Sequence, residues 1–153
     1  MQSIIIGSDP SGFALKEAVR AHLESLGYAV TDVGTTAETP VMFYDAARNL
    51  ATAISQGRFA RGIVICGSGM GVTLVANKYP GVYCAPCENV RCATQARAIN
   101  NANVLAMGGK ITSVADGIAI TDAFLNTGFL EGIEGDDRRI LQDGYAVMES
   151  LGR

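Results

Sequence analysis

The sequence lacks the features that mark several large classes of protein. No apolar run in its 153 residues approaches the roughly 20 residues that span a bilayer. The 12 Lys and Arg residues form no cluster and the net charge is −3, which leaves no electrostatic footprint for nucleic acid or for an anionic membrane surface. Only 18% of the residues are charged and 48% are hydrophobic. Such a chain gains more from burying apolar surface than it loses on ordering, so we expect a folded protein without nucleic-acid or membrane partners.

The sequence also lacks linkers, internal repeats and low-complexity tracts. Its 153 residues fall within the ~100–200 that form one domain, and we predict a single domain over residues 1–153. The N-terminal residues 1–6 have no basic flank and too short an apolar stretch for a signal peptide. We therefore expect a cytoplasmic protein.

Histidine and cysteine are scarce, which restricts the metal chemistry that can be predicted. The chain has one histidine, His22, and four cysteines. Cys84, Cys87 and Cys92 could supply three soft ligands, but neither a second Cys pair nor a His completes the tetrahedral set that zinc prefers. Free cysteines most often behave as small buried apolar residues, and we expect that role for these three, with zinc as the alternative.

Short apolar runs alternate with longer amphipathic stretches along the whole chain. Continuous apolar runs suit strands that are buried on both faces, whereas Leu15, Val19 and Leu23 recur at helical spacing and leave Lys16 off that stripe. This βα alternation predicts an open, five-stranded parallel sheet with helices on both faces. The strands are expected at residues 3–7, 28–33, 61–66, 82–85 and 103–107, and helices at about 15–26, 44–56, 71–78, 89–99, 114–126 and 137–151.

Ligands of such sheets bind at the carboxyl ends of the strands. We place three polar segments there, namely residues 7–12, 66–71 and 99–103, and expect the first two to converge on one crevice. Residues 67–71, Gly-Ser-Gly-Met-Gly, present unobstructed backbone N–H groups that suit a phosphate or a developing oxyanion. A dinucleotide site is the competing interpretation. The glycine spacing after the first strand does not fit it, although Asp32 ends the second strand.

Cys66 ends the third strand directly before this loop. The field of the loop amides and of the following helix favours its thiolate, which can act as a nucleophile or general base. The alternative is a packing cysteine. Asp9 follows the first strand, where it can orient a substrate hydroxyl or accept its proton, or else cap the first helix with Pro10 at the first helical position.

Two further polar positions have two interpretations each. Asn100, with Asn101 and Asn103, offers uncharged donors to an oxyanion or simply ends a helix. Arg138, beside Arg139, can clamp a phosphate, although a solvated helix face is the default for such a pair.

Several motifs in order along nearly the whole chain resemble the ribose-5-phosphate isomerase B and galactose-6-phosphate isomerase family. The run Cys66-Gly-Ser-Gly-Met-Gly71 with the downstream Ala76-Asn-Lys78 is specific to it. The other matching pieces are Gly7-Ser-Asp9, Gly12-Phe-x-Leu-Lys16, Gly34-Thr35, Pro80-Gly81 and Asn100-Asn-Ala-Asn-Val104.

The resemblance implies a Rossmann-like α/β three-layer sandwich and an aldose–ketose isomerase that needs no metal or cofactor and acts through an enediolate. Cys66 would be the base that moves a proton between C1 and C2, Ser68 would supply a hydroxyl, and Asp9 would contact substrate hydroxyls. The enediolate oxygen and the rest of the substrate would be bound by Gly67, Gly69, Met70, Gly71, Asn100 and Arg138. The family also implies a homodimer or homotetramer with sites at subunit interfaces, Asn100 coming from the neighbouring subunit, and the helix at 137–151 can pack on that neighbour.

Departures from the family pattern narrow the substrate. Pro10 and Ile99 stand where the ribose-phosphate members usually carry histidines, the second of which opens the sugar ring. Glu134 stands where one phosphate-binding arginine is expected, and Arg138 matches the other loosely. A four-carbon ketose phosphorylated at C4 cannot close a five- or six-membered ring, so it needs no ring-opening acid. We hypothesise a tetrulose 4-phosphate, with ribulose or ribose 5-phosphate as the other candidate.

Two alternatives stay open. Residues 108–112, Gly-Gly-Lys-Ile-Thr, resemble the B-type subunit of galactose-6-phosphate isomerase, which would need a partner subunit. A sugar-phosphate sensor without activity is the other, although phosphate binding alone would not require Cys66.

Overall fold

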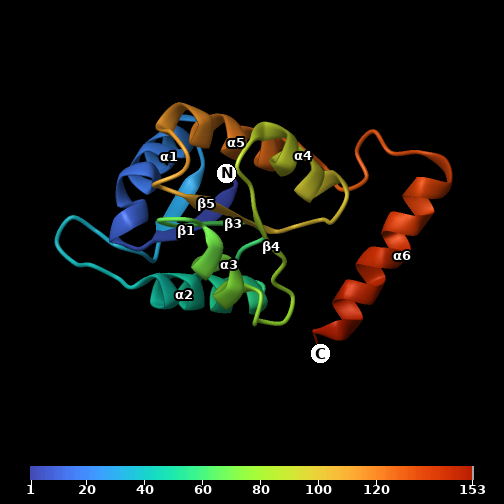
Figure 1. Ribbon diagram of the computed structural model, residues 1–153, viewed down its shortest axis with the longest axis horizontal. Helices are drawn as coiled ribbons and strands as arrows, with labels where there is room; N and C mark the ends of the chain where they lie inside the picture. The colour runs from blue at the N-terminus through green and yellow to red at the C-terminus, as the bar shows by residue number, and fades with distance from the viewer. Residues whose placement is uncertain (153) are drawn as a thin grey trace.

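The computed structural model describes residues 1–152 and contains one five-stranded parallel sheet in the order β2-β1-β3-β5-β4 (Figure 1). The strands are β1 (Ser3–Ser8), β2 (Ala29–Asp32), β3 (Gly62–Cys66), β4 (Cys84–Pro86) and β5 (Val104–Gly108). The helices are η1 (Pro10–Gly12), α1 (Phe13–Ser25), α2 (Phe43–Ser55), α3 (Met70–Ala76), α4 (Val90–Ala98), α5 (Val114–Asn126) and α6 (Gly135–Leu151).

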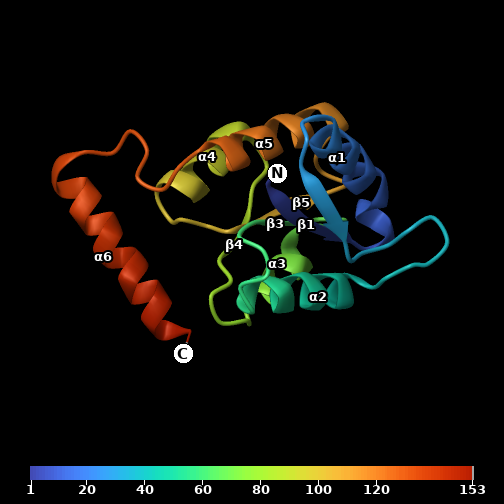
Figure 2. The same ribbon diagram turned by 180° about the vertical axis from the view of Figure 1, so that it is seen from behind.

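Helices cover both faces of the sheet, which gives three layers. Helices α1, α4 and α5 lie on one face, and α2 and α3 lie on the other (Figures 1 and 2). The side chains of β1, β3, β4 and β5 alternate between two buried clusters; in β3, for example, Ile63 and Ile65 belong to one and Val64 and Cys66 to the other. The predicted Rossmann-like α/β sandwich is confirmed.

The strand register decides which segments meet. Ser8 pairs with Ile65, and Cys66 pairs with Gly108, so the loops after β1, β3 and β5 share the carboxyl edge of the sheet. Val104 pairs with Gly62 at the opposite edge. Residues 99–103 precede Val104 and therefore lie at the amino edge, so the expectation that this segment lies at the carboxyl ends is wrong. A segment that enters a parallel strand lies at the edge opposite to one that leaves it.

The predicted fourth strand is displaced toward the C-terminus. Val82 donates its N–H to the Tyr79 carbonyl oxygen at 3.2 Å in a turn, which keeps it out of the ladder. The Asn77 side chain then brackets Cys84, accepting from its N–H at 2.7 Å and donating to its carbonyl oxygen at 2.9 Å. These side-chain bonds delay β4 until Cys84, and Asn77 also ends α3 one residue after Ala76.

Lys16 is buried, although its position off the apolar stripe of α1 predicts a solvated side chain. Its Nζ forms an ion pair with Asp32 at the end of β2 and donates to the carbonyl oxygen of Thr35 in the following loop. A buried ammonium is tolerated because these oxygen atoms replace its water. Lys16 thus joins α1 to the segment that leads to α2.

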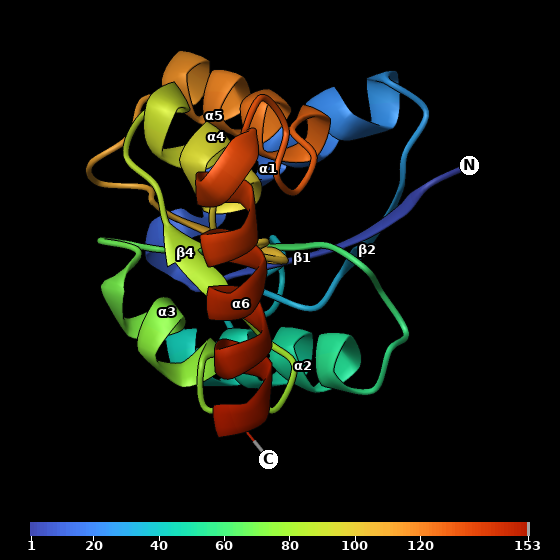
Figure 3. The ribbon, with the colours of Figure 1, turned by 90° about the vertical axis from the view of Figure 1, so that its right-hand side faces the viewer.

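Helix α6 stands apart from the sandwich, beyond the β4 edge of the sheet (Figures 1 and 2), and in the view of Figure 3 it runs in front of β4. None of its residues is buried. It is held through Tyr145, whose ring lies 5.6 Å from that of Tyr83 and 5.2 Å from that of Phe129 between centroids. Its apolar residues Ile140 and Val147 are 61% and 56% exposed, respectively. No helix within residues 1–152 is both long and apolar enough to cross a membrane.

Candidate active site

The side chain of Cys66 lies at the carboxyl end of β3 on the face covered by α2 and α3, and the residue is 6% exposed. Its Sγ accepts a hydrogen bond from the N–H of Gly69 at 3.2 Å. The sulfur atom is therefore fixed in position by a backbone amide of the loop that follows it. Gly69 has φ +80°, and a Cβ atom there would lie 3.0 Å from the carbonyl carbon of Met107, so glycine alone fits without strain.

The loop after Cys66 is held against the end of β5. The Gly109 N–H donates to the Cys66 carbonyl oxygen at 2.7 Å, and the Lys110 N–H donates to the Gly67 carbonyl oxygen at 3.0 Å. The two loops pack so closely that a Cβ atom on Gly108 would lie 2.7 Å from the carbonyl carbon of Ser68. Amides fixed in this way can stabilise a developing oxyanion without reorganising.

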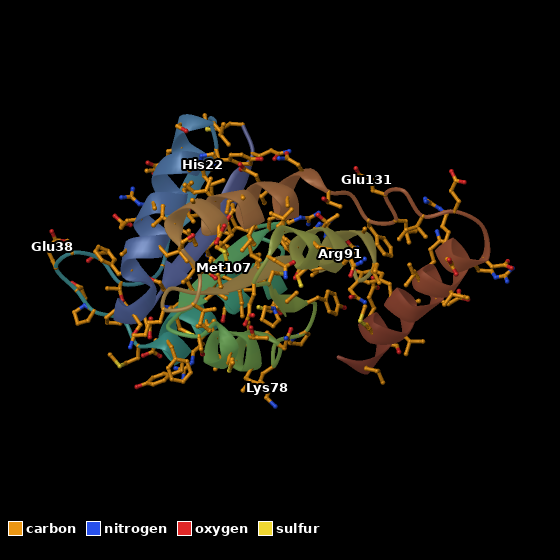
Figure 4. All side chains as sticks on the ribbon, turned by 45° about the horizontal axis from the view of Figure 1, so that its top comes forward. His22, Glu38, Lys78, Arg91, Met107 and Glu131 are labelled. Carbon is orange, nitrogen blue, oxygen red and sulfur yellow. The ribbon has the colours of Figure 1, made fainter. Side chains whose placement is uncertain are left out.

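Ser68, Met70 and Gly71 complete the loop that the sequence singled out. The Ser68 hydroxyl is exposed and accepts from the N–H of Met70 at 3.2 Å. The Thr73 hydroxyl donates to the Gly69 carbonyl oxygen at 2.7 Å and ties the loop to α3. Ser68 and Met70 line a cleft of about 240 Å³ with residues from the ends of β4 and β5, and Figure 4 shows Met107, another residue of this lining, near the centre of the molecule.

Asp9 lies beside this loop, because its N–H donates to the Ile65 carbonyl oxygen at 3.2 Å. One carboxylate oxygen, Oδ1, accepts the N–H of Gly12 at 2.9 Å, and Pro10 is the first residue of η1. The capping interpretation is therefore confirmed. Within residues 1–152, Oδ2 of Asp9 makes no further hydrogen bond, so Asp9 can cap and also face a ligand.

Two predicted site residues do not join Cys66 within one chain. Asn100 is exposed at the amino edge of the sheet. Arg138 belongs to α6, where its guanidinium donates to the carbonyl oxygens of Leu130 and Ile133, each at 3.2 Å. Either residue could meet a Cys66 loop only in another copy of the chain.

Lys110 and Ser11 flank the start of the loop, and neither was predicted from the sequence as a site residue. A Cβ atom on Gly67 would lie 3.5 Å from Cδ of Lys110 and 3.5 Å from Cβ of Ser11. Both residues are exposed, and within residues 1–152 the Lys110 ammonium has no carboxylate partner. The signal for Lys110 was available, because it follows Gly108-Gly109 directly after a strand.

The other three cysteines divide into two kinds. Cys84 and Cys87 are buried as expected, and desolvation raises the pKa of each thiol to about 12. Cys92 is exposed in the first turn of α4, so the expectation that it is buried is wrong. Within residues 1–152, no group of three or more His, Cys, Asp or Glu side chains is placed to hold a metal ion.

Asp32, which kept the dinucleotide interpretation open, already has partners. Its Oδ2 is paired with Lys16, and its Oδ1 accepts the N–H of Gly34 at 2.9 Å. The acidic side chain at the end of β2 therefore serves the fold, because each of its oxygen atoms already has a partner within the chain.

Comparison with known proteins gives one consistent result. Residues 4–142 match the model of the family described as Ribose/Galactose Isomerase. A Clostridium sp. (strain MSTE9) protein named 4-deoxy-4-sulfo-D-erythrose isomerase is 50% identical, with 98% of each chain covered. The D-erythrulose-4-phosphate isomerase of Pectobacterium atrosepticum is 37% identical, with 95% of each chain covered. The structure of Clostridium thermocellum ribose-5-phosphate isomerase B superposes with a TM-score of 0.85 at 33% identity, covering 98% of this chain and 99% of the other.

Proposed function

The chain belongs to the ribose/galactose isomerase family, and we propose that it interconverts the aldose and ketose forms of a four-carbon sugar with an anionic group on C4. The observation that carries this proposal is the Cys66 sulfur, buried and bonded to an amide of a rigid, amide-rich loop. A base beside fixed N–H donors is what proton transfer through an enediolate requires.

Cys66 is the proton carrier in this scheme. Its thiolate takes the C2 proton of the aldose, the C2–H bond breaks, and the electron pair forms the C1–C2 double bond of the enediolate. The new S–H group then returns the proton to C1, and a proton moves from the C2 oxygen to the C1 oxygen. The product is the ketose, and the thiolate is regenerated. No electrons enter or leave, so the step needs no oxidant or reductant.

The rest of the loop binds the charge that develops. In this proposal, backbone amides of residues 67–71 stabilise the enediolate oxygen, and the exposed Ser68 hydroxyl donates to an oxygen of the substrate. Without substrate, the amides of Gly69 and Met70 donate to Cys66 Sγ and Ser68 Oγ. Asp9 offers Oδ2 to a substrate hydroxyl while Oδ1 remains occupied by the cap.

The C4 anion is expected at the start of the loop. Lys110 and Ser11 flank Gly67 and supply an ammonium and a hydroxyl on its exposed side. Either a phosphate or a sulfonate presents three oxygen atoms to such donors. The names of the relatives from Pectobacterium and Clostridium include one substrate of each kind, both with four carbons.

The absence of the two family histidines, one of which opens the sugar ring, supports the short substrate. Pro10 and Ile99 cannot donate a proton to a ring oxygen, and a sugar whose C4 carries phosphate or sulfonate has no hydroxyl that closes a five-membered ring. Isomerisation of an open-chain tetrose therefore needs only the base and the amide loop.

We further propose that the whole chain is one cytoplasmic isomerase unit that works as a homodimer or homotetramer. The exposed apolar side of α6 supports this, because Ile140, Val147 and Leu151 are exposed on a helix with no buried residue. In such an assembly Asn100 and Arg138 would reach the site of a second copy.

The decisive experiment measures isomerase turnover of the purified protein alone on four substrates. These are D-erythrulose 4-phosphate, 4-deoxy-4-sulfo-D-erythrose, D-ribulose 5-phosphate and D-tagatose 6-phosphate. We expect turnover of one or both four-carbon compounds. Cys66→Ala should lose at least about a hundredfold in kcat, the scale of general-base catalysis, and still bind substrate by calorimetry.

Three outcomes would contradict the proposal. Preferential turnover of the five- or six-carbon sugar would overturn the four-carbon assignment. Full activity of Cys66→Ala would remove the thiol base. Tight binding without turnover by either protein would favour a sensor or the need for a partner subunit.

A further inference from the structure

Residues 67–71 form the glycine loop that follows Cys66. The first turn of α2 borders this loop at its Gly71 end, whereas Lys110 lies at its Gly67 end. A Cβ atom on Gly71 would lie 2.8 Å from Cε2 and 3.0 Å from Cδ2 of Phe43, so the ring packs directly on the Gly71 backbone. The ring is nevertheless 38% exposed. A partly exposed aromatic ring against a loop of the site forms an apolar wall.

The wall is held in place by the segment that precedes it. The Thr35 hydroxyl donates to the carbonyl oxygen of Val41 at 3.1 Å and accepts its N–H at 3.0 Å, which closes the neck of the loop between β2 and α2. The buried Lys16 ammonium donates to the carbonyl oxygen of the same Thr35. The loop beyond this neck projects from the sandwich, and Figure 4 shows Glu38 near its tip. Phe43 follows the pinned end, so its backbone position is defined.

The two ends of the glycine loop differ in chemistry. Gly67 is flanked by the ammonium-bearing Lys110 and by Ser11, whereas Gly71 is covered by the Phe43 ring. Cys66 belongs to the buried cluster on the α2 and α3 face, which is the side of Phe43. A substrate with its anion at Lys110 therefore directs its reacting carbons toward Cys66 and Phe43.

We propose that Phe43 is a specificity-determining residue that limits the length of the sugar by closing the site beyond the reacting carbons. This inference rests on the proposed function. With the anion anchored at one end, each added CHOH unit moves C1 and C2 past Cys66 toward the ring. The Phe43 ring also offers no hydrogen-bond partner to the additional hydroxyl of a longer sugar. That hydroxyl would therefore lose its hydrogen bonds to water without replacement.

The test compares kcat/KM for D-erythrulose 4-phosphate and D-ribulose 5-phosphate in the wild type, Phe43→Leu and Phe43→Ala. We expect the ratio of the five-carbon to the four-carbon value to rise about tenfold or more, the scale on which one carbon unit is discriminated in an apolar pocket. A purely structural role would lower both values together. Phe43→Leu keeps an apolar contact with Gly71 and serves as the variant that preserves the fold.

Tyr44→Ala is the matched control. Tyr44 is 43% exposed, neighbours Phe43 and packs edge-on against its ring with centroids 5.3 Å apart, but it is not among the atoms nearest Gly71. The ratio of the five-carbon to the four-carbon kcat/KM in Tyr44→Ala should equal that of the wild type. An unchanged ratio in folded Phe43→Leu, or a wild type that uses both sugars equally, overturns the inference alone. A wild type without turnover on either sugar and on 4-deoxy-4-sulfo-D-erythrose overturns the proposed function as well.

Discussion

Cys66 differs from the other cysteines in what surrounds its sulfur atom. Its Sγ accepts the Gly69 N–H at 3.2 Å beside a loop of amides. The Cys84 thiol has only the Thr73 hydroxyl at 3.9 Å, and that of Cys87 has the Ala85 carbonyl oxygen at 3.7 Å. The three thiols therefore differ in their partners: a backbone N–H donates to Cys66, whereas Cys84 and Cys87 have only an oxygen atom at a longer distance.

The two buried thiols, Cys84 and Cys87, predict a pH dependence of stability. Burial raises the pKa of the Cys84 and Cys87 thiols from 9.0 to about 12. Between these values the unfolded chain releases protons that the folded chain retains, so the free energy of unfolding should fall as pH rises above 9. The limiting slope is about 1.4 kcal/mol per pH unit for each thiol.

Urea unfolding at pH 8 to 11 measures this slope, with Cys84→Ala/Cys87→Ala as the comparison. The double variant starts less stable, because two side chains leave the core, but its free energy of unfolding should decline less between pH 9 and 11. Parallel curves for the two proteins would show that these thiols do not retain their protons in the folded state.

At the scale of elements, the connection from β2 to α2 depends on one buried cation. Lys16 of α1 pairs with Asp32 at the end of β2 and donates to the Thr35 carbonyl oxygen. These contacts join two elements beneath the loop that leads to Phe43. The segment is therefore anchored at its base while residues 36–40 are exposed.

Replacement of this cation should cost more than replacement of an exposed one. Lys16→Met leaves Asp32, whose side chain is 20% exposed, without its partner, and we expect a loss of about 3 kcal/mol. Arg20→Met removes a partly exposed ion-pair partner of Glu17 and Glu24 on the same helix and should cost less than about 1 kcal/mol. Chemical denaturation of both variants provides the comparison, and equal losses would contradict the role given to Lys16.

At the scale of the whole molecule, the proposed site would be shared between two copies of the chain. The Cys66 loop lies at the carboxyl edge of the sheet, and Asn100 lies exposed at the amino edge. In the proposed closed two-fold assembly, each site would combine the Cys66 loop of one copy with Asn100 of the other. The exposed apolar residues of α6 provide surface for such an assembly.

A complementation experiment tests this arrangement. Cys66→Ala and Asn100→Ala chains are each expected to be nearly inactive as homomers. When they are co-expressed with different tags, roughly half of the dimers should be hybrids with one complete site each, which restores about a quarter of wild-type turnover. Recovery close to zero in purified hybrids would show that Asn100 does not act on the Cys66 of its partner.

Much of the architecture follows from local patterns in the sequence. Apolar runs and helical spacing predicted all five strands and the main helices to within a few residues, because burial on two faces or on one stripe leaves a periodic trace. The Cys66–Gly71 loop and Asp9 could be singled out because each follows a strand directly. The family could also be recognised from the sequence, because each of its motifs is a contiguous run of residues.

The tertiary structure decided which segments share an edge and which side chains are buried against their local pattern. Asn100 precedes β5 and lies at the amino edge of the sheet, whereas Cys66 ends β3 at the carboxyl edge. This placement follows from the parallel direction of the two strands. Lys16 is buried because Asp32 and Thr35 come from a neighbouring element. The contacts of Lys110 with Gly67 and of Phe43 with Gly71 join residues more than 25 positions apart. Such contacts depend on packing between elements, which no local periodicity records.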